Sequence, residues 1–140
     1  LQYVVHGTTE GRPPELDLNK EKALLGTVLE AIQTGLVRSA HDLSEGGLAV
    51  ALAESCISGK LGAQVNVETS LRGDHALFSE SQSRILLSAA PEQAGKLEAF
   101  VRERGVPVAV IGRVEGSSLT IEVNGTTAVN EPVGGLTQVW

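Results

Sequence analysis

Methionine is absent from the 140 residues of the chain, which begins at Leu1. An initiator methionine ahead of a bulky leucine would ordinarily be retained, and no charged-then-apolar secretory signal precedes Leu1 to explain the missing start. We therefore expect the chain to be a piece of a longer polypeptide.

Cysteine, positive charge and long apolar runs are also scarce. The single cysteine, Cys56, can form neither an internal disulfide nor a cysteine-based metal site, and a reducing cytoplasm is the expected location. The apolar runs are far shorter than the ~20 residues that span a bilayer. With 11 basic against 17 acidic residues the formal charge is −6, so a phosphate backbone would be repelled. Neither a membrane nor a nucleic acid is therefore expected as a partner.

The composition that remains is that of a folded domain. Hydrophobic residues make up 41% of the chain and charged residues 20%. A chain of this length buries roughly two thirds of its unfolded surface, so it needs neither a disulfide nor a metal to fold. We expect a lead-in segment over residues 1–17 and one domain over 18–140.

The clearest helical signal lies near residues 18–35. Asp17 stands at the position of an N-cap, and Gly35 is a natural stop. Between them, apolar residues recur at helical spacing on one face, at Leu25, Val28, Leu29, Ile32 and Leu36. These signals predict an amphipathic helix.

The rest of the chain alternates between strand and helix patterns. Strands are predicted over 36–41, 63–67, 84–88, 106–114, 119–123 and 127–129, a buried helix over 48–57, a turn or short helix over 70–79, a helix from Pro91 to Gly105, and a truncated helix at the carboxyl end. Asn124-Gly125 is typical of a hairpin turn. This order predicts an α/β (α+β) fold with one mixed, partly antiparallel sheet and helices packed on it.

The first candidate site is the polar run from His41 to Gly47, between a strand and the buried helix. It contains His41, Asp42, Ser44, Glu45, Gly46 and Gly47. Free backbone N–H groups at a helix start attract phosphate or carboxylate groups, and glycines allow close backbone approach. On this interpretation a valine at position 47 would crowd the loop. The alternative is that Asp42 or Ser44 only caps the helix and the glycines only permit a tight turn.

The second candidate site is the polar run Ser79-Glu80-Ser81-Gln82-Ser83, before the strand at 84–88. Glu80, Ser81 and Gln82 are its candidate binding residues. Short polar side chains at the edge of a sheet suit the hydroxyl or amide groups of a ligand. The alternative is a plain turn with an Asx-like or serine-mediated cap, and spacing alone favours that alternative.

Four stretches together resemble one enzyme family. They are VHG and GRPPELDL within residues 5–18, EKAL over 21–24, SAHDLSEGGLAVALAE over 39–54 and LFSESQSR over 77–84. In order and spacing they resemble the PurL family, the synthetase components of phosphoribosylformylglycinamidine synthase. The resemblance covers essentially the whole chain and falls on the AIR synthase-related C-terminal domain of the second half of such proteins. It implies a fold like the C-terminal domain of PurM, partly ferredoxin-like.

The resemblance also implies a function. PurL-like enzymes use ATP and magnesium to activate the amide oxygen of formylglycinamide ribonucleotide, and ammonia from a glutaminase partner then gives the amidine. The catalytic histidine and most magnesium ligands of such enzymes belong to other domains, so neither a catalytic nor a metal-binding residue is assigned to this chain, which is not expected to be active alone. Its expected partners are the remaining synthetase domains and the glutaminase.

Two other functions fit the residues. The chain could be the C-terminal domain of another AIR synthase-like, ATP-using synthetase, such as selenophosphate synthetase, or a stand-alone nucleotide-binding or scaffolding module. Whether the loop at Gly46 and Gly47 contacts substrate, a structural nucleotide or only its own helix stays open at this stage.

Overall fold

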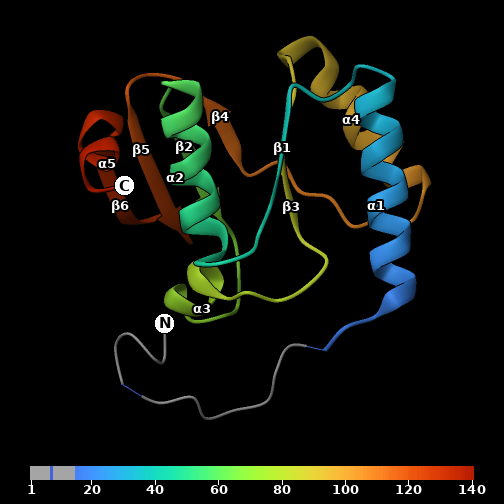
Figure 1. The fold of residues 1–140 in the computed structure, drawn as a ribbon, viewed down its shortest axis with the longest axis horizontal. Coiled ribbons are helices and arrows are strands. Elements are labelled where there is room, and N and C mark those ends of the chain that lie inside the picture. The colour runs from blue at the N-terminus through green and yellow to red at the C-terminus, as the bar shows by residue number, and fades with distance from the viewer. Residues whose placement is uncertain (1–6, 8–14) are drawn as a thin grey trace. The chain divides into compact units, whose positions relative to one another are not determined.

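The computed structural model describes residue 7 and residues 15–140, which form the helices and strands labelled in Figure 1. The helices are α1 (Leu18–Gln33), α2 (Gly47–Gly59), α3 (Gly73–Phe78), α4 (Pro91–Glu103) and α5 (Val133–Val139). The strands are β1 (Ser39–Asp42), β2 (Ala63–Val67), β3 (Ile85–Ser88), β4 (Gly112–Val114), β5 (Ser118–Val123) and β6 (Thr126–Pro132). Most of the lead-in predicted over residues 1–17 lies outside the described residues.

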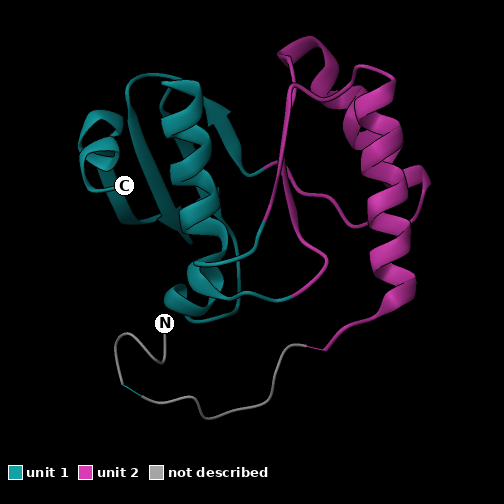
Figure 2. Ribbon diagram, viewed as in Figure 1, with its two compact units in different colours: residues 1–14, 43–81, 111–140 teal, residues 15–42, 82–110 magenta. Residues whose placement is uncertain are grey.

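These elements gather into two compact units (Figure 2). Among the described residues, unit 1 holds 43–81 and 111–140, and unit 2 holds 15–42 and 82–110. The chain therefore passes from one unit to the other after residues 42, 81 and 110.

Unit 1 is built on a mixed sheet with the strand order β4-β2-β5-β6. The β2–β5 pair is parallel, while β2–β4 and β5–β6 are antiparallel. The hairpin between β5 and β6 turns at Asn124 and Gly125, whose φ values of 51° and 75° are the left-handed pair that a tight two-residue turn requires. Leu119 and Ile121 of β5 are 1% and 0% exposed and belong to the core. Helix α2 packs on this sheet (Figure 1).

Unit 2 pairs two helices with a two-stranded antiparallel ladder, β1 with β3. Its core is a cluster of buried apolar side chains from α1, α4 and the segment that follows α4; these are Ala31, Leu97, Val101 and Val106. The Arg104 guanidinium joins the end of α4 to α1 through the Glu30 carboxylate, 2.7 Å away. The unit therefore has a hydrophobic centre of its own.

Most predicted elements are confirmed, and so is the mixed α/β class with helices on a mixed sheet. The single sheet is wrong, because the described strands form two separate sheets. Residue periodicity identifies a strand, but partner choice depends on contacts between distant segments. The strand predicted over 84–88 is confirmed as β3, although its residues are half-buried rather than buried.

Two further expectations need correction. In the segment 106–114 only β4 is a strand, because Val106 packs into the core of unit 2 and the chain crosses to unit 1 after residue 110. On the apolar face predicted for α1, Val28 is buried as expected, but Leu25, Leu29 and Ile32 are exposed. Ala31 and Thr27 complete the buried face. In the part of the chain that the structure describes, no helix is long and apolar enough to cross a membrane.

Candidate functional site

The loop before α2 is shaped by two consecutive glycines in unit 1. Gly46 and Gly47 have φ values of 78° and 64°, in the left-handed region that side chains rarely adopt. A Cβ added to Gly47 would lie 2.6 Å from the Ser79 carbonyl oxygen and 2.9 Å from that of Leu77. Only glycine allows the start of α2 to approach the end of α3 so closely.

The two predicted site segments meet in this unit. The Gly46 N–H donates a hydrogen bond to the Glu80 carboxylate at 3.0 Å, although the residues are 34 positions apart. A carboxylate is a favourable neighbour for the positive end of a helix. The anion expected at the start of α2 is thus, in this structure, a side chain of the protein itself.

The remaining predicted residues divide between the units. Ser44, Glu45 and Ser81 lie with the glycine loop in unit 1, and the Ser44 carbonyl accepts from the Gly47 N–H at 3.2 Å. The N-cap of α2 is Gly46, and neither Ser44 nor Asp42 caps the helix with its side chain, so the two caps considered from the sequence are wrong.

His41, Asp42 and Gln82 lie in unit 2. His41 and Asp42 end β1, and the His41 Nδ1 is 2.7 Å from the Asp42 carbonyl oxygen. Asp42 pairs with Ile85 across the ladder, and Gln82 comes three residues before Ile85 in the chain. The chain thus brings Gln82 toward the same end of the β1–β3 ladder at which β1 stops.

Sequence reasoning placed Ser83 in the polar run before β3 without predicting its contact, and it assigned no role to Arg84. Ser83 has a φ of 61°, and its Oγ donates to Glu21 Oε2 at 2.5 Å. Glu21 lies in the first turn of α1, 62 positions away. No local pattern marks such a contact. The next residue, Arg84, is half-buried, and burial lowers the pKa of its guanidinium from the ordinary value.

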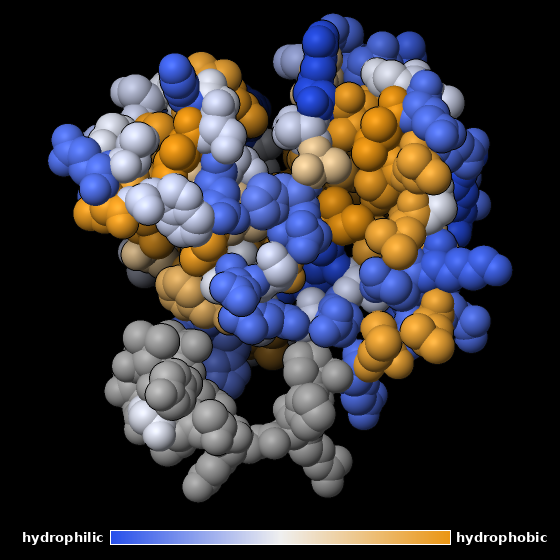
Figure 3. All heavy atoms as spheres, in the orientation of Figure 1, coloured by the Kyte–Doolittle hydropathy of each residue, from blue (hydrophilic) through white to orange (hydrophobic). Residues whose placement is uncertain are grey.

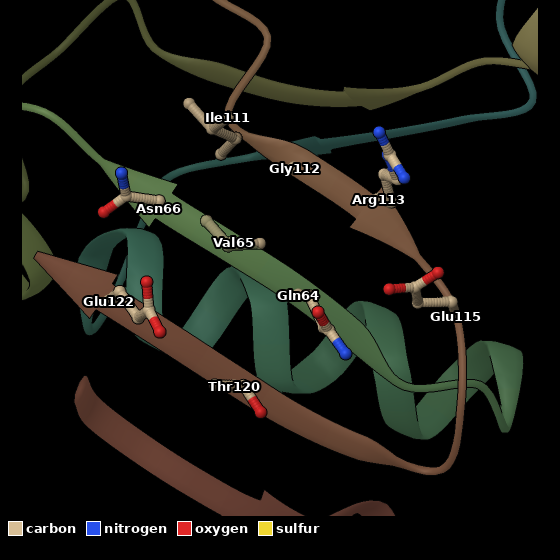
Figure 4. Close-up of a pocket in the computed structure, with 9 residues that line it drawn as sticks. All are labelled: Gln64, Val65, Asn66, Ile111, Gly112, Arg113, Glu115, Thr120 and Glu122. Atoms are coloured by element: carbon tan, nitrogen blue, oxygen red, sulfur yellow. The ribbon is translucent and has the colours of Figure 1, made fainter. Parts of the chain in front are cut away.

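A separate hollow of about 270 Å³ lies over the sheet of unit 1 (Figure 4). Its polar side chains come from positions that alternate with the core residues of β2 and β5, so they occupy the face away from α2; they include Gln64, Asn66, Thr120 and Glu122. None of the predicted site residues lines this hollow.

The fold is a mixed α/β domain with a glycine loop before α2, and the comparisons identify its family. The model of the family described as AIR synthase related protein, C-terminal domain, matches residues 3–124. The chain therefore belongs to this family.

Two relatives with high sequence identity are both PurL subunits. The chain is 50% identical over 135 residues to the phosphoribosylformylglycinamidine synthase subunit PurL of Moorella thermoacetica, covering 96% of this chain and 18% of the relative. It is 46% identical over 137 residues to the PurL subunit of Caldanaerobacter subterraneus, covering 98% and 19%. The predicted resemblance to PurL is confirmed, and the chain spans about a fifth of the length of these relatives.

Solved structures agree with the fold. T. maritima PurL complexed with FGAR matches with a TM-score of 0.80 at 26% identity, covering 96% of this chain and 24% of that one. T. maritima PurL complexed with ATP matches with a TM-score of 0.73 at 29% identity, covering 82% and 21%. The hydrogenase maturation protein HypE in complex with ATP has a TM-score of 0.63 at 20% identity, covering 76% and 39%, which shows a shared fold alone.

Proposed function

We propose that this chain is part of a cytoplasmic phosphoribosylformylglycinamidine synthase, an ATP- and magnesium-dependent ligase of purine biosynthesis. The observation that carries the proposal is the 50% identity to a PurL subunit over 96% of the chain. In this proposal residues 18–140 act as the C-terminal domain of the second half of the synthetase. Its partners are the other synthetase domains and a glutaminase that supplies ammonia.

The proposed reaction replaces the amide oxygen of formylglycinamide ribonucleotide by nitrogen. Bound ATP supplies the phosphoryl group that converts this oxygen into a leaving group. The residues of this chain bind and orient rather than react. The amide of Gln82 can both donate and accept a hydrogen bond, and the backbone of Gly46 and Gly47 allows a ligand to approach closely.

A nucleotide that binds at the start of α2 would meet the Glu80 carboxylate, which already lies there. Glu80 already accepts from the Gly46 N–H, so a phosphate group binding there would displace Glu80 or use other donors. The described residues offer a magnesium ion fewer ligands than they offer a nucleotide. Among residue 7 and residues 15–140, no three His, Cys, Asp or Glu side chains lie close enough to hold a metal ion. We propose that the magnesium is held mainly by residues elsewhere in the enzyme.

A chimeric enzyme tests the proposal. The matching segment of Moorella thermoacetica PurL is replaced by this chain, and amidine formation is measured with ammonia, and with glutamine plus the glutaminase partner. We expect ATP-dependent product with both nitrogen sources. The unaltered Moorella enzyme is the reference. A folded chimera that forms no amidine would contradict the proposal and favour another ATP-using synthetase.

The proposed binding residues are tested in the same chimera. Gln82→Ala is expected to raise KM for formylglycinamide ribonucleotide or ATP several-fold, because it removes a ligand hydrogen bond worth about 1 kcal/mol. Gln33→Ala, at the exposed end of α1, is the matched control. Equal KM values for the two variants would remove Gln82 from the site.

A further inference from the structure

Ser83 adopts a backbone conformation that its position in the fold does not explain. Among the described residues three non-glycines have a positive φ: Lys60, Ser83 and Asn124. Lys60 is the C-cap of α2 and Asn124 begins a hairpin turn, both places where left-handed residues are usual. Ser83 is at neither, and stands between Gln82 and Arg84 just before β3. Such strain persists only where surrounding contacts hold it.

One contact that holds Ser83 comes from α1. The Ser83 Oγ donates to the Glu21 carboxylate at 2.5 Å, and the pair is partly buried within unit 2. Glu21 is itself well anchored, because Asp17 caps the same turn by accepting from the N–H groups of Asn19 and Lys20. The first turn of α1 therefore holds the Glu21 carboxylate in place as the acceptor for the Ser83 hydroxyl.

The conformation of Ser83 sets the direction of Gln82. The φ angle describes rotation about the bond from the Ser83 nitrogen to its Cα, so it orients the Gln82–Ser83 peptide relative to β3. Relaxation to an ordinary negative φ would rotate this peptide by roughly 120°. The Gln82 side chain would move with it.

We propose that Glu21 is a positioning residue for Gln82, acting through the Ser83 hydroxyl. The role in ligand binding rests on the proposed function, whereas the conformational coupling does not. Glu21→Ala and Ser83→Ala each remove the contact. Glu21→Gln retains an acceptor oxygen.

The coupling is measured by NMR on the 140-residue protein. A positive φ brings the amide and α protons of Ser83 unusually close, which gives a strong cross-peak within the residue. We expect that cross-peak to weaken in Glu21→Ala and to persist in Glu21→Gln. An unchanged cross-peak in Glu21→Ala would overturn the proposal.

The consequence for the ligand is measured in the chimera. Glu21→Ala and Ser83→Ala are each expected to raise KM for formylglycinamide ribonucleotide or ATP several-fold, no more than Gln82→Ala does, with little change in kcat. The double variant should be no worse than either single one, and Glu21→Gln should restore KM. The control is Glu30→Ala, which breaks another contact of α1 within unit 2, to Arg104, and should lower stability without raising KM.

The outcomes separate the two proposals. If the unaltered chimera makes no amidine while the NMR result is as expected, the proposed function fails and the coupling stands. If the chimera is active and KM is the same in Glu21→Ala as in Glu30→Ala, the positioning role is wrong and the proposed function stands.

Discussion

Gly47 and Gly35 share a backbone conformation but differ in their surroundings. Their φ values are 64° and 74°. A Cβ at Gly35 would meet nothing within 4 Å, whereas one at Gly47 would meet the Ser79 carbonyl oxygen at 2.6 Å. The comparison of these two positions separates conformational strain from steric overlap.

We expect Gly35→Ala to cost about 1–2 kcal/mol of unfolding free energy, from the left-handed conformation alone. Gly47→Ala should cost about 1–3 kcal/mol more, because backbone atoms of α3 and Ser79 would have to shift. Urea denaturation of both variants measures the difference. Equal losses would mean that the loop before α2 relaxes freely around a side chain.

Cys56 is a buried thiol on α2, and burial raises its pKa above the ordinary value. The folded state therefore favours the neutral thiol. Above the unfolded pKa of about 8.5, deprotonation favours the unfolded chain, so stability is lost as the pH rises beyond that value.

We expect the free energy of unfolding to fall more between pH 7 and pH 10 for the natural chain than for Cys56→Ala. Chemical denaturation at both pH values measures this. Ellman's reagent should label Cys56 slowly in the native protein and rapidly in urea. Fast native labelling would show that the thiol is reached without unfolding.

At the scale of the element, α1 shows that an apolar pattern need not be the buried face. Val28 is 7% exposed and Leu29, its neighbour, is 56% exposed. Leu18, Leu25 and Leu29 border an open hollow of about 500 Å³ along this helix. Figure 3 shows apolar side chains reaching the surface in several places.

Val28→Ala is therefore expected to cost about 1–3 kcal/mol of unfolding free energy, while Leu29→Ala changes it by less than about 0.5 kcal/mol. Both are measured by thermal and urea unfolding of the purified chain. A larger loss for Leu29→Ala would show that this apolar face is covered in solution.

Elements with a local signal were predicted well. α1 begins after Asp17 as its capping carboxylate requires, and the β5–β6 hairpin turns where Asn124-Gly125 stands. The segment 106–111 was mistaken for strand because its valines favour that state, and only packing of Val106 into unit 2 decides otherwise. The contact between Glu80 and Gly46 was likewise beyond any local pattern.

At the scale of the whole molecule, each unit has its own core. Val101 is 4% exposed within the apolar cluster of unit 2, and Ile121 is fully buried in unit 1. Shortening the Val101 side chain would leave a cavity in the core of unit 2 and remove packing contacts there.

We expect Val101→Ala to lower hydrogen-exchange protection of the α1 and α4 amides more than that of the β5 amides, because cooperative units open separately. Ile121→Val is the matched change in unit 1 and should reverse the pattern. Equal loss of protection in both units, in both variants, would show that the chain opens as one.

The sequence by itself determined the class of fold, most elements and the likeness to PurL, because caps, turn residues and periodicity act over a few residues. Tertiary structure alone decided the division into two sheets, the buried face of α1, and two long-range contacts, Glu80 with Gly46 in unit 1 and Glu21 with Ser83 in unit 2. Those features depend on which distant segments meet, and that choice is made by packing and hydrogen bonding across the folded chain.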